Sequence, residues 1–115
     1  MIRDNVEGII LVLTTFPEDV DFAAFARTLV DERLAACVSV VTGVRSIYRW
    51  GDGVEDSMEQ QVLIKTGVTC IAPLKEKLLE LHPYQLPEFL IVQAGGDRRY
   101  LEWINASTQS YGMDV

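Results

Sequence analysis

The sequence contains little histidine, cysteine and proline, with one His, two Cys and four Pro in 115 residues. The two cysteines, Cys37 and Cys70, share no CxxC spacing, so a disulfide or thiol-redox motif is a poor explanation for them. There is no HExxH motif and no Ser-His-Asp order, and a single histidine limits acid–base chemistry further. These absences predict a protein that is not a conventional enzyme. Chemistry through the thiol of Cys37 is the one enzymatic alternative that stays open.

Long hydrophobic runs are also absent. The longest, residues 8–13 and 89–92, fall far short of the roughly 20 residues that span a bilayer. Near the N-terminus, Asp4 and Glu7 interrupt any apolar stretch before the core of a signal peptide could form. We therefore expect no membrane association and a cytoplasmic location.

Basic side chains are outnumbered by acidic ones. Ten Lys and Arg stand against seventeen Asp and Glu, which gives a formal net charge of -7. Such a charge repels phosphate backbones, so no nucleic-acid partner is expected. It favours the attraction of cations, although it is equally what keeps an ordinary cytosolic protein soluble.

What is present fits one α+β domain over residues 1–115, with its core in about residues 9–108, because a chain of this length holds a single core. Residues 9–15 form an apolar, β-branched run typical of a central strand buried on both faces. Helical spacing of apolar residues follows Pro17 and recurs over residues 71–81. Another strand is predicted at 89–94, and Asp97 can cap a last helix whose inward residues are Tyr100, Leu101 and Ile104.

Residues 37–50 and 54–66 read as the two strands of a long hairpin around the sequence GDG. If all three loop residues form the turn, Arg49 faces Glu55 and Arg45 faces Glu59 across the ladder. The resulting βαββαβ order, followed by a helix, predicts a ferredoxin-like α+β fold with helices on one face of an antiparallel sheet.

The predicted hairpin is longer than its own domain can cover. A strand of about 14 residues spans roughly 46 Å, whereas a 100-residue domain has a radius of gyration of about 13 Å. An isolated arm would expose aromatic side chains and unpaired strand edges, which predicts that a second copy of the chain receives it. The alternative is a strand bulged or broken near Gly43 that folds back onto its own domain.

Six segments follow one another in a characteristic order: ERLAACVSVV, GVRSIYRW, the GDG tip, VLIKT, LHPYQLPE and YLEWINAS. Together they resemble the CutA divalent-cation tolerance family over about residues 9–108. The resemblance implies a ferredoxin-like homotrimer with long interlocked strands, a link to copper and other divalent cations, and no established reaction. It does not imply a metal that is required for folding. The architecture also resembles the nitrogen-regulatory signalling trimers.

The family resemblance favours His82 as a copper ligand. A lone histidine is more often a helix-end or hydrogen-bonding group, but ligands from neighbouring chains of a trimer can converge on one ion. Cys37 is a second candidate ligand, although its apolar neighbours favour burial. Glu59, with Glu55, can supply carboxylates to a divalent ion unless the arginines of the hairpin occupy them. Some members carry a thiol near the end of the first strand, where this chain has Thr14. This difference predicts a lower affinity for metal ions or a preference for harder ions, with Cu(II) among the candidates.

Two other groups suggest a ligand site between subunits. Lys65 is a charge inside an apolar strand, so we expect it to pair with an anionic side chain such as Glu88 or, as the alternative function, to hold a small anionic ligand in a signalling or adaptor trimer. The aromatic residues are expected to fill the subunit interface or to line a small pocket there: Tyr48, Trp50, Tyr84, Tyr100 and Trp103.

Overall fold

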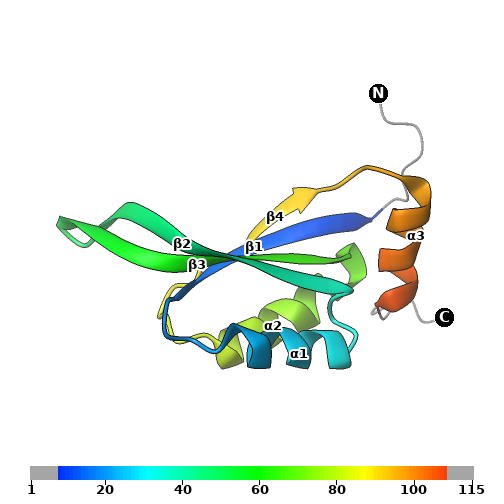
Figure 1. Ribbon diagram of the computed structural model, residues 1–115, viewed down its shortest axis with the longest axis horizontal. Coiled ribbons are helices and arrows are strands. Elements are labelled where there is room, and N and C mark those ends of the chain that lie inside the picture. Colours follow the sequence, from blue (N-terminus) through cyan, green and yellow to red (C-terminus); the bar gives the residue numbers. More distant parts are fainter. Residues whose placement is uncertain (1–7, 109–115) are drawn as a thin grey trace.

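The structure, a computed structural model, describes residues 8–108 and contains one four-stranded sheet with three helices (Figure 1). In chain order the elements are β1 (Ile9–Pro17), α1 (Phe22–Asp31), β2 (Cys37–Trp50), β3 (Gly53–Gly67), a 3-10 turn (Val68–Cys70), α2 (Ile71–Leu81), β4 (Leu90–Gln93) and α3 (Arg98–Ser107). The sheet order is β2-β3-β1-β4, and every neighbouring pair is antiparallel. The predicted ferredoxin-like α+β fold with a terminal helix is confirmed.

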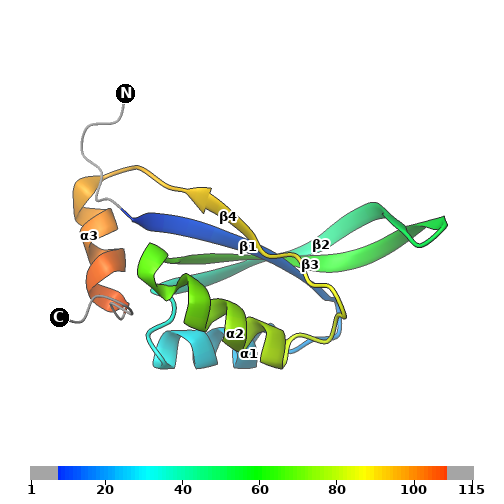
Figure 2. The same cartoon turned by 180° about the vertical axis from the view of Figure 1, so that it is seen from behind.

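Helices α1 and α2 lie side by side on one face of the sheet, and the core lies between these two layers (Figures 1 and 2). Alternate residues of the central strands β1 and β3 face the helices, as the two-residue period of a strand requires. The largest fully buried apolar side chains of this layer come from four elements: Val12, Phe16, Leu29, Val62, Ile64, Leu74 and Leu78.

Side-chain caps set the starts of α1 and α3. The carboxylate of Asp21 accepts a 3.2 Å hydrogen bond from the backbone N–H of Ala24, and that of Asp97 accepts one of 3.0 Å from Tyr100. Such caps satisfy backbone donors that the first turn leaves unpaired. The cap at Asp97 was predicted, but Tyr100 is 44% exposed, so its predicted inward position was wrong.

The hairpin β2–β3 has a shorter turn than the sequence suggested. Trp50 pairs with Gly53, which leaves only Gly51 and Asp52 in the loop. Gly51 has φ +62 at the first loop position, as in the two-residue turns whose twist matches a hairpin. A loop one residue shorter shifts every pairing along the arm.

The predicted charge pairs across the arm were therefore wrong. Arg45 lies opposite Met58 and Arg49 lies opposite Val54, so neither Glu59 nor Glu55 faces an arginine. Arg45 instead reaches the diagonal neighbour Asp56 in a bidentate ion pair of 2.9 and 2.7 Å. Because of this register, Arg45 and Arg49 do not occupy the carboxylates of Glu55 and Glu59.

A β-bulge does occur at Gly43, where Thr42 and Gly43 stand opposite Gln60 and Gly43 adopts φ +72. The strand bends there but does not fold back, so that part of the alternative was wrong. Figures 1 and 2 show the hairpin projecting well beyond the sheet and both helices, and the longest dimension of the described chain is 46 Å.

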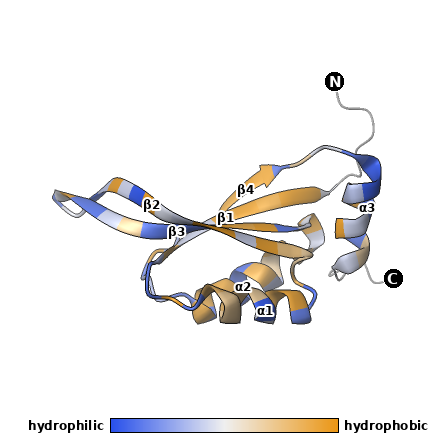
Figure 3. Cartoon of the chain, viewed as in Figure 1, coloured by the Kyte–Doolittle hydropathy of each residue, from blue (hydrophilic) through white to orange (hydrophobic). Residues whose placement is uncertain are grey.

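Within residues 8–108, the second face of the sheet is largely open. Helix α3 contacts only the end of it, where Leu101 and Ile104 pack on Ile9. Beyond this contact, β4 leaves Leu90 and Val92 53% and 46% exposed, opposite Leu13 and Leu11. Figure 3 shows the same apolar stretch on β1 and β4. In residues 8–108 no helix is long and apolar enough to cross a bilayer.

Candidate functional site

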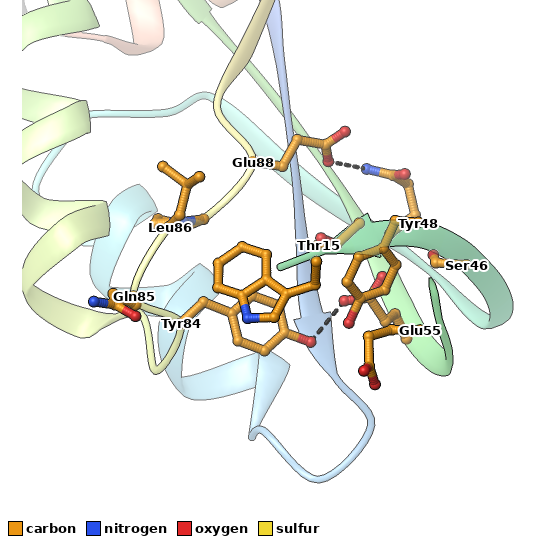
Figure 4. Close-up of a pocket in the computed structure, with 12 residues that line it drawn as sticks. Thr15, Ser46, Tyr48, Glu55, Tyr84, Gln85, Leu86 and Glu88 are labelled. Atoms are coloured by element: carbon orange, nitrogen blue, oxygen red, sulfur yellow. Dashed lines mark hydrogen bonds between the residues drawn. The ribbon is translucent and has the colours of Figure 1, made fainter. Parts of the chain in front are cut away.

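A cavity of about 840 Å³ runs along one face of the arm, from Glu59 near its base to Trp50 beside the turn, and is bordered by the loop between α2 and β4 (Figure 4). Its residues come from β1, the two arm strands and that loop: Thr15, Ser46, Tyr48, Trp50, Glu55, Glu59, Gln61, Tyr84, Gln85, Leu86, Pro87 and Glu88. The cavity therefore depends on the register of the arm and on the position of the loop.

His82 fixes the start of the loop. Its ring stacks on Phe16 with centroids 4.3 Å apart, and its Nδ1 accepts a 3.0 Å hydrogen bond from the backbone N–H of Tyr84. Because Nδ1 is an acceptor, Nε2 carries the proton and donates to the carbonyl of Thr15 at 2.7 Å. Burial lowers the pKa of His82 below 6.5, although the Thr15 carbonyl and the charge of Glu59 oppose this. A neutral imidazole thus supports, from outside the lining residues, the loop that forms one wall of the cavity.

Glu59 is the most enclosed carboxylate of the cavity, with 5% of its surface exposed. Its Oε2 accepts a 2.6 Å hydrogen bond from the hydroxyl of Tyr84, marked by a dashed line in Figure 4. Burial, and then this bond, raise the pKa of the Tyr84 hydroxyl well above 10.0, so the hydroxyl remains a donor. A short bond to a charged acceptor is among the stronger hydrogen bonds in proteins, so it holds the loop against β3.

A second link joins the loop to the sheet further along. The side-chain amide of Gln61 donates to the carbonyl of Thr14 at 2.9 Å and to Glu88 at 3.2 Å. The cavity thus contains Glu55, Glu59 and Glu88, and no Lys, Arg or His is among its lining residues in the described part of the chain. Because three carboxylates line the cavity and none of its described lining residues is basic, the site favours positively charged ligands.

Comparison with known proteins agrees with this fold. The family model for the CutA1 divalent ion tolerance protein matches residues 10–107. The chain belongs to the CutA1 family. The divalent-cation tolerance protein CutA of Thermus thermophilus is 42% identical over 99 residues, which cover 85% of this chain and 96% of that protein.

Solved structures of CutA1 proteins superpose closely on the chain. The Thermus thermophilus structure has a TM-score of 0.84 at 41% identity and covers 88% of this chain and 99% of its own. A CutA from Nostoc, described as PII-like, has a TM-score of 0.81 at 33% identity and covers 89% and 99%. Among relatives found by sequence, a chloroplastic CutA of Arabidopsis thaliana is 36% identical over 102 residues, which cover 88% of this chain and 56% of that protein.

The fold of this CutA1-family chain brings together two of the three predicted metal ligands. Glu59 lines the cavity, and His82 lies behind it, linked to Glu59 through Tyr84, whose backbone N–H bonds to His82 and whose hydroxyl bonds to Glu59. Cys37 pairs with Lys65 at the far end of β3, about 20 Å from Glu59 at about 3.3 Å per residue. One chain therefore cannot place Cys37 and Glu59 on the same ion.

No three His, Cys, Asp or Glu side chains within residues 8–108 are grouped closely enough to hold a metal ion. Thr14 does not add to the site, because its side chain lies on the helix-covered face and is fully buried. A divalent ion at the cavity would thus find carboxylate oxygens, with the imidazole of His82 behind the lining residues, so water or a second copy must complete the ligand set.

The aromatic residues divide into two groups. Tyr48, Trp50 and Tyr84 line the cavity, while Tyr100 and Trp103 pair on α3 with centroids 5.5 Å apart. The hydroxyl of Tyr100 accepts a 3.0 Å hydrogen bond from Lys65. The predicted partner of Lys65, Glu88, bonds to Gln61 instead, so that pairing was wrong.

Sequence reasoning missed Gln61, Ser46 and Thr15 as cavity residues. Gln61 and Thr15 belong to no motif, and Ser46 lies in the segment GVRSIYRW, in which nothing marks it as a cavity residue. Ser46 and Gln61 reach the cavity through the register that the two-residue turn and the bulge set, whereas Thr15 reaches it from β1. The position of Gln61 directly before the apolar residues 62–64 of the same strand was the one available signal.

Proposed function

We propose that this CutA1-family protein acts in divalent-cation tolerance by binding a divalent cation, Cu(II) first, in the acidic cavity of a homotrimer. The observation that carries the proposal is a cavity with three glutamates and no basic residue among its described lining residues, in a chain of net charge -7. No catalytic step forms part of it, and a cytoplasmic location stays a prediction from the sequence.

Glu59 is the first ligand in this proposal. It accepts one hydrogen bond, on Oε2, and carboxylate oxygens suit hard and borderline divalent ions. His82 is second, because an ion must displace either the Tyr84 N–H from Nδ1 or the Thr15 carbonyl from Nε2 to reach it. Cys37 stays in the proposal only as a ligand from a neighbouring copy, given its distance from Glu59.

The homotrimer is supported by two surfaces that the described residues of one chain leave exposed. One is the open sheet face around Leu90 and Val92, and the other is the arm, where Ile47 and Val54 are 65% and 64% exposed. Packing copies so that each arm lies on a neighbour would cover both surfaces. Sedimentation at low micromolar concentration tests this: a trimer is expected, and a well-folded single chain would contradict it.

A small anionic ligand is the weaker alternative. Lys65 motivated it, but this side chain bonds to Tyr100 near α3 and does not line the cavity. The three glutamates of the cavity would repel an anion.

Calorimetric titration with Cu(II) tests the metal site. Glu59→Gln keeps an acceptor for the Tyr84 hydroxyl but removes the charge, and should weaken binding by at least about tenfold. His82→Gln should weaken it less, because both nitrogens are already bonded. The matched control is Glu76→Gln, an exposed residue of α2 outside the cavity. Equal affinities of Glu59→Gln and the wild type would overturn the assignment.

A further inference from the structure

The acidic cavity has a second chemical property, an aromatic wall. Tyr48 and Trp50 enter it from β2, and Tyr84 enters from the loop after α2. Figure 4 shows Tyr48, Glu55 and Tyr84 bordering one space, with Glu88 further along it. Aromatic rings and carboxylates thus alternate around the same cavity.

A bare metal ion does not account for these rings. Divalent ions are held by oxygen, nitrogen and sulfur atoms, and ring faces supply none of these. The cavity of about 840 Å³ is also in the range of small-molecule sites, about 300 to 1,000 Å³, and far larger than one ion. Both features indicate an organic ligand.

The sign of the ligand's charge follows from the same residues. The faces of Trp and Tyr rings attract organic cations through the ring quadrupole, an arrangement that recognises alkylated ammonium groups. Carboxylates beside the rings supply the opposite charge and accept N–H hydrogen bonds. Trp50 and Tyr48 are 50% and 39% exposed in the single described chain, and both are lining residues of the cavity.

We propose that this cavity binds an organic cation whose ammonium group lies against Tyr48, Trp50 and Tyr84 and is neutralised by Glu55 and Glu59. The inference concerns the same cavity as the proposed function but does not rest on metal binding, because an ammonium group needs no coordination sphere. Since both cations use Glu59, an organic cation and Cu(II) compete for the site.

Three probes distinguish the chemistry: choline, spermidine and 3,3-dimethyl-1-butanol, the neutral analogue of choline. Titrations follow the ¹H–¹⁵N spectrum of the full chain in EDTA, so failure of metal binding cannot affect them. At least one ammonium probe should bind at least about tenfold more tightly than the neutral alcohol. Tighter choline binding indicates a quaternary ammonium ligand, and tighter spermidine binding indicates a polyamine. Equal binding of the alcohol, or no binding of either cation, would overturn the proposal.

Matched variants locate the probe. Trp50→Leu should weaken binding of the preferred cation by about twofold to thirtyfold, the range for losing one cation–π contact, and Trp50→Phe should restore most of it. Glu55→Gln should weaken it as well. The controls are Trp103→Leu and Glu102→Gln on α3, outside the cavity. Sedimentation of each variant checks that the assembly is unchanged. Equal losses in the α3 controls would contradict the placement.

Discussion

The hydroxyl of Tyr84 donates a 2.6 Å hydrogen bond to the carboxylate of Glu59, and this bond joins the loop after α2 to the middle of β3. Through the backbone N–H of Tyr84, the same residue is bonded to His82. One tyrosine therefore sets the position of both proposed ligands from this chain. The site is organised before any cation arrives, which reduces the cost of ordering it.

Tyr84→Phe tests the importance of that bond for the fold. It leaves the enclosed Glu59 carboxylate without its donor, which should lower the free energy of unfolding by about 1 to 3 kcal/mol. Chemical denaturation at one fixed protein concentration measures this, because subunit association contributes to apparent stability.

Tyr100→Phe is the matched control, since it also removes a hydrogen-bonded hydroxyl, but one whose bond to Lys65 lies on a 44% exposed residue where water can replace it. We expect a change within about 0.5 kcal/mol there. Equal effects of the two substitutions would show that the hydrogen bond to Glu59 stabilises the fold no more than the exposed hydroxyl of Tyr100 does.

The folded pKa of His82 should lie below 6.5, since burial is the largest influence on it. The unfolded chain then binds a proton at higher pH than the folded chain. Between 6.5 and the lower folded pKa, the free energy of unfolding therefore falls as the pH falls. Below the folded pKa of His82, this group lowers the free energy of unfolding no further.

Because His82 is the only histidine, a ¹H–¹³C titration reads its pKa without ambiguity. The difference in stability between wild type and His82→Gln, measured across the same pH range, isolates its contribution from that of the carboxylates. A folded pKa at or above 6.5 would contradict the buried neutral imidazole.

Much of the fold was predictable, because periodicity marks elements directly. The run at residues 9–15, the cap at Asp97 and the end of α2 before His82 are local patterns, and each reappears in the structure. The pairing of Arg45 with Asp56, in place of the predicted Glu59, was not predictable, because it depends on a turn one residue shorter than the glycines suggested. A one-residue shift changes every partner across an arm.

The candidate site was predictable only in part for the same reason. Helix-end position and family resemblance indicated His82, and strand position indicated Glu59. Tyr84 was identified as an aromatic of a pocket or interface, but not as the residue that links these two. That link depends on the position of the loop in the tertiary structure, which no local sequence pattern predicts.

The bulge at Gly43 gives a prediction about the arm. Gly43→Ala places a Cβ at φ +72, which should cost about 1 to 2 kcal/mol although no atom lies within 4 Å of that Cβ. Gly53→Ala is the control, since the space there is also open and its φ lies outside the left-handed region. Thermal unfolding of the two variants compares them. A Gly53→Ala loss as large as that of Gly43→Ala would show that backbone strain is not the cause.

Thr14→Val tests a buried hydroxyl that has no hydrogen-bond partner among the described residues. Replacing it by a methyl group of similar shape should raise the free energy of unfolding, by up to about 1 to 3 kcal/mol. Thr66→Val is the matched control, because that buried hydroxyl donates to the carbonyl of Leu34 at 2.7 Å. It should lower stability by about 1 kcal/mol. Denaturant midpoints of both variants measure these changes in stability. If Thr14→Val lowers the free energy of unfolding, the hydroxyl of Thr14 is not unpaired and the prediction is contradicted.

The central claim is that a divalent cation binds at the acidic cavity beside Glu59. Anomalous difference maps from crystals grown with Cu(II), collected on both sides of the copper edge, test it most directly. We predict a peak within coordinating distance, about 2.0 to 2.2 Å, of a Glu59 carboxylate oxygen, a distance taken from comparable carboxylate–metal bonds. Copper peaks at other positions, with none in this cavity, would contradict the account.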